Sequence, residues 1–456
     1  MVDLLDTQIA AALGPQMDTP AATLIDSGAL PSYFDVAGLA TASVTAAAQE
    51  LAAVIGLHDG QSVQVDRRLA QMWFGMTLRP DGWQMPGAWD AIAGDYQTAD
   101  GWIRLHTNAP HHRAAAMAVL GCRQTRAGVT ACVENWSGDT LESAIVSAGG
   151  CAAVMRSPQD WAVHPQGRAV AQEPLIHWQD QPDTQAPPLP AGLAGLRVLD
   201  LTRVLAGPVA TRFLAGFGAD VLRIDPPGWS EPGVEPEVTL GKRCAGLDLG
   251  IRKDRQVFET LLHGADVLVH GYRPDALARM GYDSATRQAL SPGLIDVSLC
   301  AYGWTGPWAG RRGFDSLVQM SSGIAQAGME RGNHPKPHPL PLQALDHAAG
   351  YLMAAAVLRA VRLRQTGGAG QTARLSLART AALLTAAGYT DPNTSLRDET
   401  LADLAPGTEN TSWGAARRVR FPVQLDGNGP DWPHPAGALR SSPAVWHAAT
   451  PSWRPT

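Results

Sequence analysis

The sequence predicts an α/β protein whose main sheet is largely parallel and covered by helices on both faces, together with a smaller α+β domain. From residue 193 onward, short apolar runs alternate with segments of helical periodicity, a pattern typical of repeated strand and helix units. Residues 85–176 differ in composition, being rich in Trp and His. A chain of 456 residues is also longer than one ordinary domain, so we expect two or three.

The strands of the predicted sheet are continuous apolar runs, which are typical of strands buried on both faces of a parallel sheet. The first reads LRVLDL, and a loop and the helix VATRFLAGF separate it from the next strand, ADVLRID. The alternation continues through GKRCAGLDL, ADVLVH and LIDVSLC. Ligands of such sheets bind at the carboxyl ends of the strands, which points to the loops 202–208, 271–275 and 301–308. None of these loops reads GxGxxG or GxxxxGK[ST], so dinucleotide and P-loop sites are disfavoured.

Composition and pattern divide the chain into five segments. They are an N-terminal segment (1–84), the small α+β domain (85–176), a Pro-rich linker (177–192), a large domain (193–390) and a C-terminal tail (391–456). We expect the tail to pack back on the large domain. The small domain contains the pair His111 and His112. Adjacent side chains point to opposite sides of a helix or strand, and no carboxylate lies at ligand spacing, so we predict no metal site.

The overall charge and apolar content indicate a small-molecule partner. The chain is 45% apolar and 17% charged with a net charge of -6, which favours neither nucleic-acid binding nor a polybasic membrane surface. Its five cysteines show no CxxC spacing, so we expect reduced thiols rather than a disulfide framework or a zinc site. The N-terminus has no basic segment, and no apolar run approaches the ~20 residues that span a bilayer. We therefore expect a cytoplasmic, soluble protein.

A weak internal repeat relates the N-terminal segment to the end of the large domain. Residues 35–74 and 346–384 each begin with Asp and continue as an Ala-rich helix, a Gly turn, an alternating strand and a helix. In this alignment Asp35 corresponds to Asp346. We interpret residues 1–84 as a truncated copy of the end of the large domain.

Asp346 is the candidate on which a functional interpretation depends. It begins an apolar helix whose many Ala and Gly residues allow close packing of the backbone. A carboxylate at a helix N-terminus is most often a cap, so this alternative stays open from the local sequence.

Several ordered blocks resemble the class III CoA-transferase family, which includes formyl-CoA and carnitine CoA-transferases and α-methylacyl-CoA racemase. They are LAGLRVLDLTRVLAGPVATRFLAGFGADVLRID, GKRCAGLDL, ADVLVHGYRPDALARMGYD, SLCAYGWTGPWAGRRGFDSLVQMSSGI and the segment that contains Asp346. Residues 85–175 also resemble the small domain of that family. The resemblance implies a Rossmann-like large domain, but in the family the small domain follows the core, whereas here it precedes it.

The resemblance implies CoA transfer from an acyl-CoA to a carboxylic acid, with Asp346 as the nucleophile. The intermediates would be an aspartyl–acyl anhydride and an aspartyl-CoA thioester, with CoA as a substrate and no permanently bound cofactor. By position, the resemblance assigns CoA contacts to Leu205, Ala206, Leu247, Asp248, Leu249, Gly271, Tyr272, Arg273, Arg279, Arg312, Gly313, Phe314 and Asp315. Arg279 would meet the CoA phosphates. The resemblance further implies an interlocked homodimer.

Two departures from the family keep alternatives open. Leu205 stands where transferases such as the formyl enzyme have glutamine, and no Gly-rich loop covers the site. Phe314 stands where the racemases have a proton-transferring histidine, which disfavours racemisation or isomerisation. A CoA-binding subunit without catalytic activity is the remaining alternative. Leu205, Phe314 and the many Trp residues suggest an apolar acyl pocket, but the sequence identifies neither acid.

Overall fold

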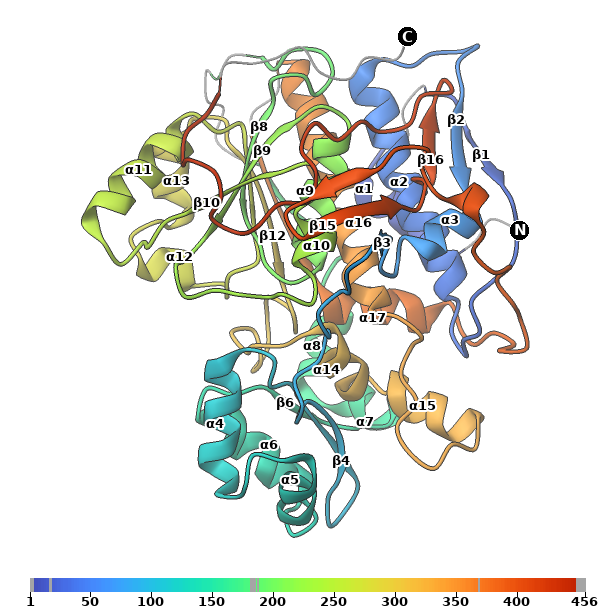
Figure 1. The fold of residues 1–456 in the computed structure, drawn as a ribbon, viewed down its shortest axis with the longest axis vertical. Helices are drawn as coiled ribbons and strands as arrows, with labels where there is room; N and C mark the ends of the chain where they lie inside the picture. Colours follow the sequence, from blue (N-terminus) through green and yellow to red (C-terminus); the bar gives the residue numbers. More distant parts are fainter. Residues whose placement is uncertain (1–3, 16–18, 181–185, 187, 368–369, 448–456) are drawn as a thin grey trace.

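The computed structural model describes residues 4–15, 19–180, 186, 188–367 and 370–447. It is built around one seven-stranded sheet (Figure 1). In spatial order the strands are β10 (Arg243–Gly246), β9 (Asp220–Asp225), β8 (Arg197–Leu201), β11 (Val267–His270), β12 (Ile295–Cys300), β13 (Gln371–Ser376) and β7 (His177–Asp180). Six strands run parallel, and only the edge strand β7 is antiparallel to its neighbour β13. The predicted α/β class is thus confirmed.

Helices cover both faces of this sheet because its strands are apolar on both sides. Val198 and Val267 lie on one face of the sheet. This face is covered by α9 (Ala206–Gly216), α16 (Ala344–Gln365) and α17 (Leu377–Ala386). Leu199 and Leu268 point to the other face, covered by α11 (Arg252–His263), α12 (Ala276–Arg279) and α13 (Ser284–Leu290). In the segment DALARMG only Ala276–Arg279 is helical, and no helix was expected at the position of α13.

The segment before the linker forms a separate small body, at the bottom of Figure 1. Strands β4 (Gly94–Gln97), β5 (Trp102–Leu105) and β6 (Ala152–Val154) form its antiparallel sheet. Its helices are α4 (Pro110–Leu120), α5 (Arg126–Val133) and α6 (Gly138–Ser147), and it has its own apolar core. Helices α7 (Pro158–Val163) and α8 (Pro165–Gln172) lead from it back to the sheet.

The N-terminal segment packs on the large domain through a helix pair. It comprises α1 (Leu4–Leu13), β1 (Ala22–Ile25), α2 (Val36–Ile55), β2 (Val63–Asp66), α3 (Arg67–Met72) and β3 (Leu78–Pro80). Helix α2 lies along α16, its partner in the internal repeat. By length and composition α2 could cross a membrane, although we expect no membrane-spanning run from the sequence. In the folded protein 78% of its apolar stretch is buried. It serves as a core helix of this fold.

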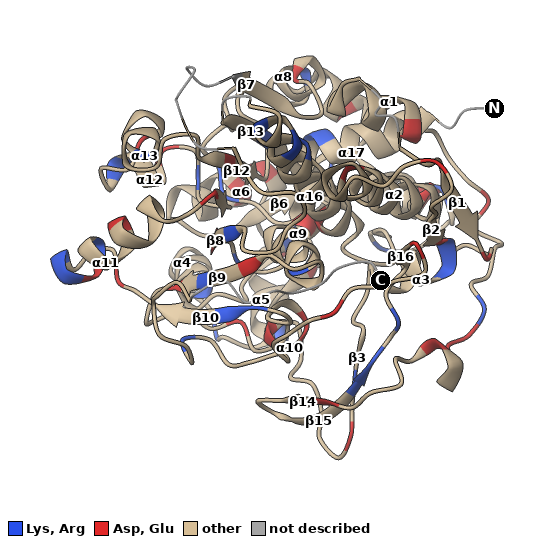
Figure 2. Cartoon of the chain, turned by 90° about the horizontal axis from the view of Figure 1, so that it is seen from above, with Lys and Arg blue, Asp and Glu red and all other residues tan. Residues whose placement is uncertain are grey.

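Small residues let α16 approach its neighbours closely, as the sequence predicts. A β-carbon on Gly350 would lie 2.5 Å from the carbonyl oxygen of Ala206, so a larger residue would push α16 away from α9. The cartoon in Figure 2 shows α2 almost without charged residues, whereas α11 carries several at the periphery. This apolar packing fixes the helix that carries Asp346.

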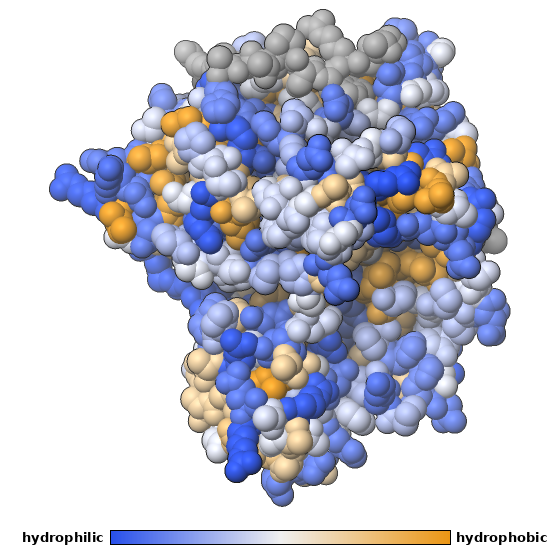
Figure 3. All heavy atoms as spheres, in the orientation of Figure 1, coloured by the Kyte–Doolittle hydropathy of each residue, from blue (hydrophilic) through white to orange (hydrophobic). Residues whose placement is uncertain are grey.

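The strands of the C-terminal tail pair with those of the N-terminal segment, and the later tail residue Ser442 accepts from and donates to Cys244 of the edge strand β10. Strands β14 (Glu409–Thr411) and β15 (Gly414–Arg418) form a sheet with β3, and β16 (Val423–Leu425) pairs with β2. The short helix η1 (Leu401–Asp403) lies before them. A buried ion pair between Arg418 and Glu237 also ties the tail to α10 (Glu235–Val238) of the large domain. On the face shown in Figure 3, hydrophobic residues form separate patches.

The predicted linker 177–192 begins as a strand, because His177–Asp180 pairs with β13 and extends the sheet. Its residues 181–185 and 187 lie outside the described residues, as do residues 448–456 of the predicted tail. Two further helices follow: α14 (Asp315–Ser321) contacts β5 and β6 of the small domain, and α15 (Ile324–Arg331) lies to the side, against α14 and α7 (Figure 1).

Candidate active site

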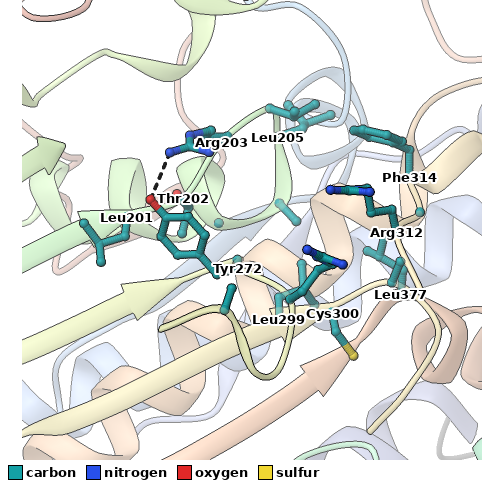
Figure 4. A pocket seen from close by; sticks show the side chains of 18 of the residues that line it. Leu201, Thr202, Arg203, Leu205, Tyr272, Leu299, Cys300, Arg312, Phe314 and Leu377 are labelled. Atoms are coloured by element: carbon teal, nitrogen blue, oxygen red, sulfur yellow. Dashed lines mark hydrogen bonds between the residues drawn. The ribbon is translucent and has the colours of Figure 1, made fainter. Parts of the chain in front are cut away.

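A cavity of about 560 Å³ opens at the carboxyl ends of the central strands (Figure 4). Loops after β8, β11 and β12 contribute residues 201–207, 271–274 and 299–301. The strand order reverses between β8 and β11, and such switch points leave a crevice in open parallel sheets. The sheet therefore places the cavity where the sequence predicts a ligand site. Asp346 is the single acidic residue among the described residues that line it.

Asp346 is the third residue of α16 and does not cap it. The N-cap position is Gln343, and the Asp346 carboxylate accepts no hydrogen bond from the described residues. The side chain lies at the cavity wall, and the residue is 8% exposed. The alternative that Asp346 serves only as a helix cap is therefore not supported, because its carboxylate accepts no hydrogen bond from a backbone N–H of the helix.

Asp315, at the start of α14, takes the capping role instead. Its Oδ2 accepts a hydrogen bond from the backbone N–H of Asp346 at 2.9 Å. Its other oxygen accepts one from Gln319, whose own carbonyl oxygen holds the N–H of Leu340 at 2.7 Å. A buried carboxylate thus fixes the first turn of α16 without touching the cavity.

The two carboxyl groups cannot both ionise easily. Burial and then the charge of Asp315 raise the pKa of Asp346 well above its usual range. Burial raises the pKa of Asp315 to about 6, although its hydrogen bonds to the Asp346 N–H and Gln319 oppose that rise. Because only Asp315, of the two, accepts hydrogen bonds that stabilise its charge, we assign the shared negative charge to Asp315 and the proton to Asp346.

Arginines give the rest of the cavity a positive character. Arg203, Arg273, Arg311 and Arg312 all line it. The guanidinium of Arg203 donates to the Tyr272 hydroxyl at 2.9 Å, as Figure 4 shows, and lies 4.8 Å from the Trp229 ring centroid. This arrangement suits a ligand with phosphate or carboxylate groups.

The loop after β8 is held in a strained conformation at the cavity. Val204 has φ of 65°, a region that β-branched residues rarely adopt. Its backbone N–H donates to Glu231 at 2.8 Å, which helps to hold the turn. Leu205 follows directly and lines the cavity. Such strain is often kept at functional loops.

The small domain closes one side of the cavity through histidines. His111 and His112, at the start of α4, line it together with Phe314. The Phe314 ring stacks on His106 with centroids 3.6 Å apart and meets the His112 ring nearly perpendicularly at 5.8 Å. Phe314 therefore joins the two domains at the cavity wall.

The structure gathers most of the predicted site residues at the cavity. Lining it are Leu205, Ala206, Gly271, Tyr272, Arg273, Arg312, Gly313, Phe314 and Asp346. Asp315 lies behind Asp346. Leu247 and Leu249 are buried under α11, Asp248 lies between them, and Arg279 is exposed and pairs with Asp275 on α12. These four do not line the cavity, and their contacts with CoA stay predictions.

Four cavity residues were not named as site residues from the sequence. Arg203 lies in the predicted ligand loop 202–208 but is not singled out there, Trp229 carries no motif, and His111 and His112 suggest only a metal site. Among the described residues, no group of three or more His, Cys, Asp or Glu could hold a metal ion. The position of His111 and His112 as a polar pair at the start of a helix is the sequence feature that could have indicated a ligand site.

Residues 193–408 match the model of CoA-transferase family III. The chain is 34% identical over 210 residues to an acetyl-coenzyme A transferase of Hypoxylon pulicicidum, covering 45% of this chain and 35% of that protein. It is 33% identical over 175 residues to a succinate–glutarate CoA-transferase of Agrobacterium fabrum, covering 34% and 42%. A crystal structure of a Mycobacterium tuberculosis protein is 31% identical with a TM-score of 0.40, covering 42% and 55%. The chain thus spans about half or less of the length of these relatives.

Proposed function

We propose that the protein moves CoA from an acyl-CoA thioester to a carboxylic acid, with Asp346 as the nucleophile, because residues 193–408 match the model of CoA-transferase family III. The observation that carries this proposal is the Asp346 carboxyl group, which faces an arginine-lined cavity and has no hydrogen-bond partner among the described residues. A carboxylate kept free of internal hydrogen bonds is available to a substrate.

The proposed reaction conserves the energy of the thioester. The Asp346 carboxylate attacks the acyl carbonyl of the donor, forming a mixed anhydride and releasing CoA thiolate. The thiolate then attacks the aspartyl carbonyl, which gives an aspartyl-CoA thioester and frees the donor acid. The acceptor carboxylate attacks this thioester, and the released thiolate attacks the acyl carbonyl of the new anhydride. The products are the new acyl-CoA and a regenerated Asp346, and no ATP is consumed.

In the proposed mechanism Asp346 must lose a proton before it reacts. The raised pKa of Asp346 means that a proton must leave before the carboxylate attacks. A carboxylate with a raised pKa is also the better nucleophile once it is ionised. Asp315 holds the backbone at the reacting residue, and the arginines would bind the anionic parts of both substrates.

Two alternatives make different demands on the site. Racemisation or isomerisation through position 314 is disfavoured, since the Phe314 ring carries no titratable group and lies stacked on His106. A CoA-binding subunit without catalysis would bind CoA but exchange no label. The unpartnered Asp346 favours catalysis over this alternative.

Trapping the enzyme-bound acyl group tests the proposal. The protein is incubated with an acyl-CoA and then with hydroxylamine, and the modified residue is located by peptide mass spectrometry. We expect Asp346 alone to be converted to a hydroxamate, because only an activated acyl-aspartate reacts. CoA-induced thermal stabilisation without modification or label exchange would instead support the non-catalytic alternative.

The interlocked homodimer and the cytoplasmic location stay predictions. A screen of acyl-CoA donors against carboxylic acids, read by mass spectrometry, would identify the acids. Light scattering at micromolar concentration would test the dimer, and a monomeric mass would contradict it.

A further inference from the structure

The two copies of the internal repeat carry matching groups of three strands. In the second copy, β13 pairs in parallel with β12 on one side and antiparallel with β7 on the other. In the first copy, β2 pairs in parallel with β1 and antiparallel with β16. The order and the directions agree, so β1 takes the place of β12 and β16 takes the place of β7.

Helix caps fix the register of this correspondence. Asp66 and Ser376 are the last residues of β2 and β13, and each caps the helix that follows. Asp66 lies opposite Ile25 of β1, and Ser376 lies opposite Cys300 of β12. Ile25 therefore corresponds to Cys300, and the preceding residues of the two strands correspond in order.

The strands β1 and β12 differ in what lies along their other edge. There β12 pairs in parallel with β11, whereas no strand of the described residues pairs with this edge of β1. Leu299 and Cys300 are 8% and 9% exposed, but the corresponding Leu24 and Ile25 are 45% and 41% exposed. Figures 1 and 2 both show β1 at the border of the molecule. The first copy thus exposes apolar side chains that the second copy buries.

The sequence of β1 does not protect this edge. Its four residues read ATLI, with no charged residue and no proline, the two commonest protections of an edge strand. The edge strand β7 is polar, HWQD, and the tail covers β10, because the N–H of Ser442 donates to the carbonyl oxygen of Cys244 at 2.7 Å. An apolar, unprotected edge is suited to pairing with a strand of another chain.

We propose that the free edge of β1 binds a partner polypeptide through an added parallel β-strand, in the place that β11 takes beside β12. The partner's strand is apolar like VLVH of β11, because Leu24 and Ile25 point to opposite faces of the sheet and both need cover. His270 of β11 lies opposite Ser298, which corresponds to Thr23. The added strand therefore places its own counterpart of His270 opposite Thr23. This surface does not depend on the proposed function.

A synthetic peptide with the sequence of residues 264–271, GADVLVHG, probes the edge of the full-length protein. Fluorescence anisotropy of the labelled peptide gives its Kd, and hydrogen exchange read by mass spectrometry follows the amides of β1. At a peptide concentration of about ten times Kd, exchange in β1 should slow by about tenfold, because the amides exchange only when the peptide has left. A peptide of the same composition in scrambled order should leave exchange unchanged.

The direction of the added strand is tested with a spin label on either end of the peptide. In the predicted parallel register the carboxyl end of the peptide lies beside Ile25. A label at that end should broaden the methyl NMR signal of Ile25 more strongly than a label at the amino end. The opposite result would mean antiparallel pairing and would overturn the assignment to the place of β11.

A charge on the edge tests its role. Leu24→Lys should weaken peptide binding by at least about fivefold, because charged side chains protect edge strands from pairing. Leu4→Lys is the matched control, since Leu4 is also apolar and 42% exposed but lies on α1, outside the sheet. It should bind the peptide as wild type does. Thermal melting would show that both variants fold.

Absence of protection in β1 at millimolar peptide, or equal weakening in the two variants, would overturn the proposal. A second copy of this chain is the other occupant that the edge could take. Light scattering decides this case. A dimer that Leu24→Lys separates into monomers, and Leu4→Lys does not, would assign the edge to a second copy and overturn the partner polypeptide.

Discussion

Asp35 and Asp346 stand at matching positions of the internal repeat, yet they do different things. Asp35 is the N-cap of α2, and its Oδ1 accepts a hydrogen bond from the N–H of Gly38 at 2.7 Å. Asp346 lies inside the first turn of α16, and Asp315 takes over the capping. The same residue type before a similar Ala-rich helix is thus structural in one copy and available to a ligand in the other.

The rest of each copy explains the difference. The strands that follow the two helices, β2 and β13, each lead into a capped helix, with Asp66 capping α3 and Ser376 capping α17. However, β13 belongs to the seven-stranded sheet, whereas β2 pairs only with β1 and β16. The cavity therefore forms beside Asp346 and does not reach Asp35. A carboxylate becomes a candidate nucleophile only when the sheet supplies the pocket.

The sharpest test of this comparison replaces each aspartate by asparagine. Asp346→Asn should abolish CoA transfer, lowering kcat by more than about a thousandfold, because an amide cannot form the anhydride. Asp35→Asn should leave kcat within about twofold, because Asn is an equally good N-cap. Transferase assays of the two purified variants measure both effects.

CoA binding provides the control for these two variants, since neither change alters the shape of the cavity. Both should bind CoA with nearly the wild-type Kd in calorimetry. Full activity in Asp346→Asn would show that the two aspartates do not differ as we infer.

Asp315→Asn should give an intermediate effect. Losing one charge-assisted hydrogen bond to the first turn of α16 should lower kcat/KM by about tenfold, which corresponds to ~1.4 kcal/mol. The negative charge of Asp315 raises the pKa of Asp346, so its removal should move the acidic limb of the pH profile to lower pH. A profile of kcat/KM from pH 4 to 9 measures both changes. An unshifted acidic limb would contradict the coupling of the two carboxyl groups.

The smallest expected effect is on stability. Asp346 has a raised pKa in the folded protein, so the native state loses stability as pH rises above the unfolded value, near ~3.9. Asp346→Asn removes this loss and should stabilise the protein by about 0.5–2 kcal/mol at pH 7. The gain should vanish below about pH 3, where the carboxyl group is protonated in both the folded and the unfolded state.

Asp35→Asn is again the comparison in the stability experiment. Its free energy of unfolding should differ from wild type by only a few tenths of a kcal/mol at either pH, because the cap is retained. Urea titrations at pH 3 and pH 7 provide these free energies. A destabilised Asp346→Asn at pH 7 would mean that its carboxylate stabilises the fold.

The local hydrophobic pattern was enough to predict the alternating strands and helices of the large domain. It was also enough to predict that the cavity lies at the carboxyl ends of the strands. The apolar runs that became β8, β9, β11 and β12 are buried on both faces, so their assignment needs no knowledge of distant partners. The strand β7 was missed because HWQD lacks an apolar pattern and is ordered only by pairing with β13. The tail strands likewise depend on β2 and β3, more than 300 residues earlier in the chain.

By itself, the sequence determined the α/β class, the Ala-rich helix that carries Asp346 and the motifs that match the family, because these depend on residue type and short spacing. Tertiary structure decided which carboxylate caps α16, which arginines face the cavity, and that His112 reaches it from the small domain. These features depend on side chains brought together from elements far apart in the chain. Burial and neighbouring charge, which act only after folding, then set the pKa values on which the proposed chemistry depends.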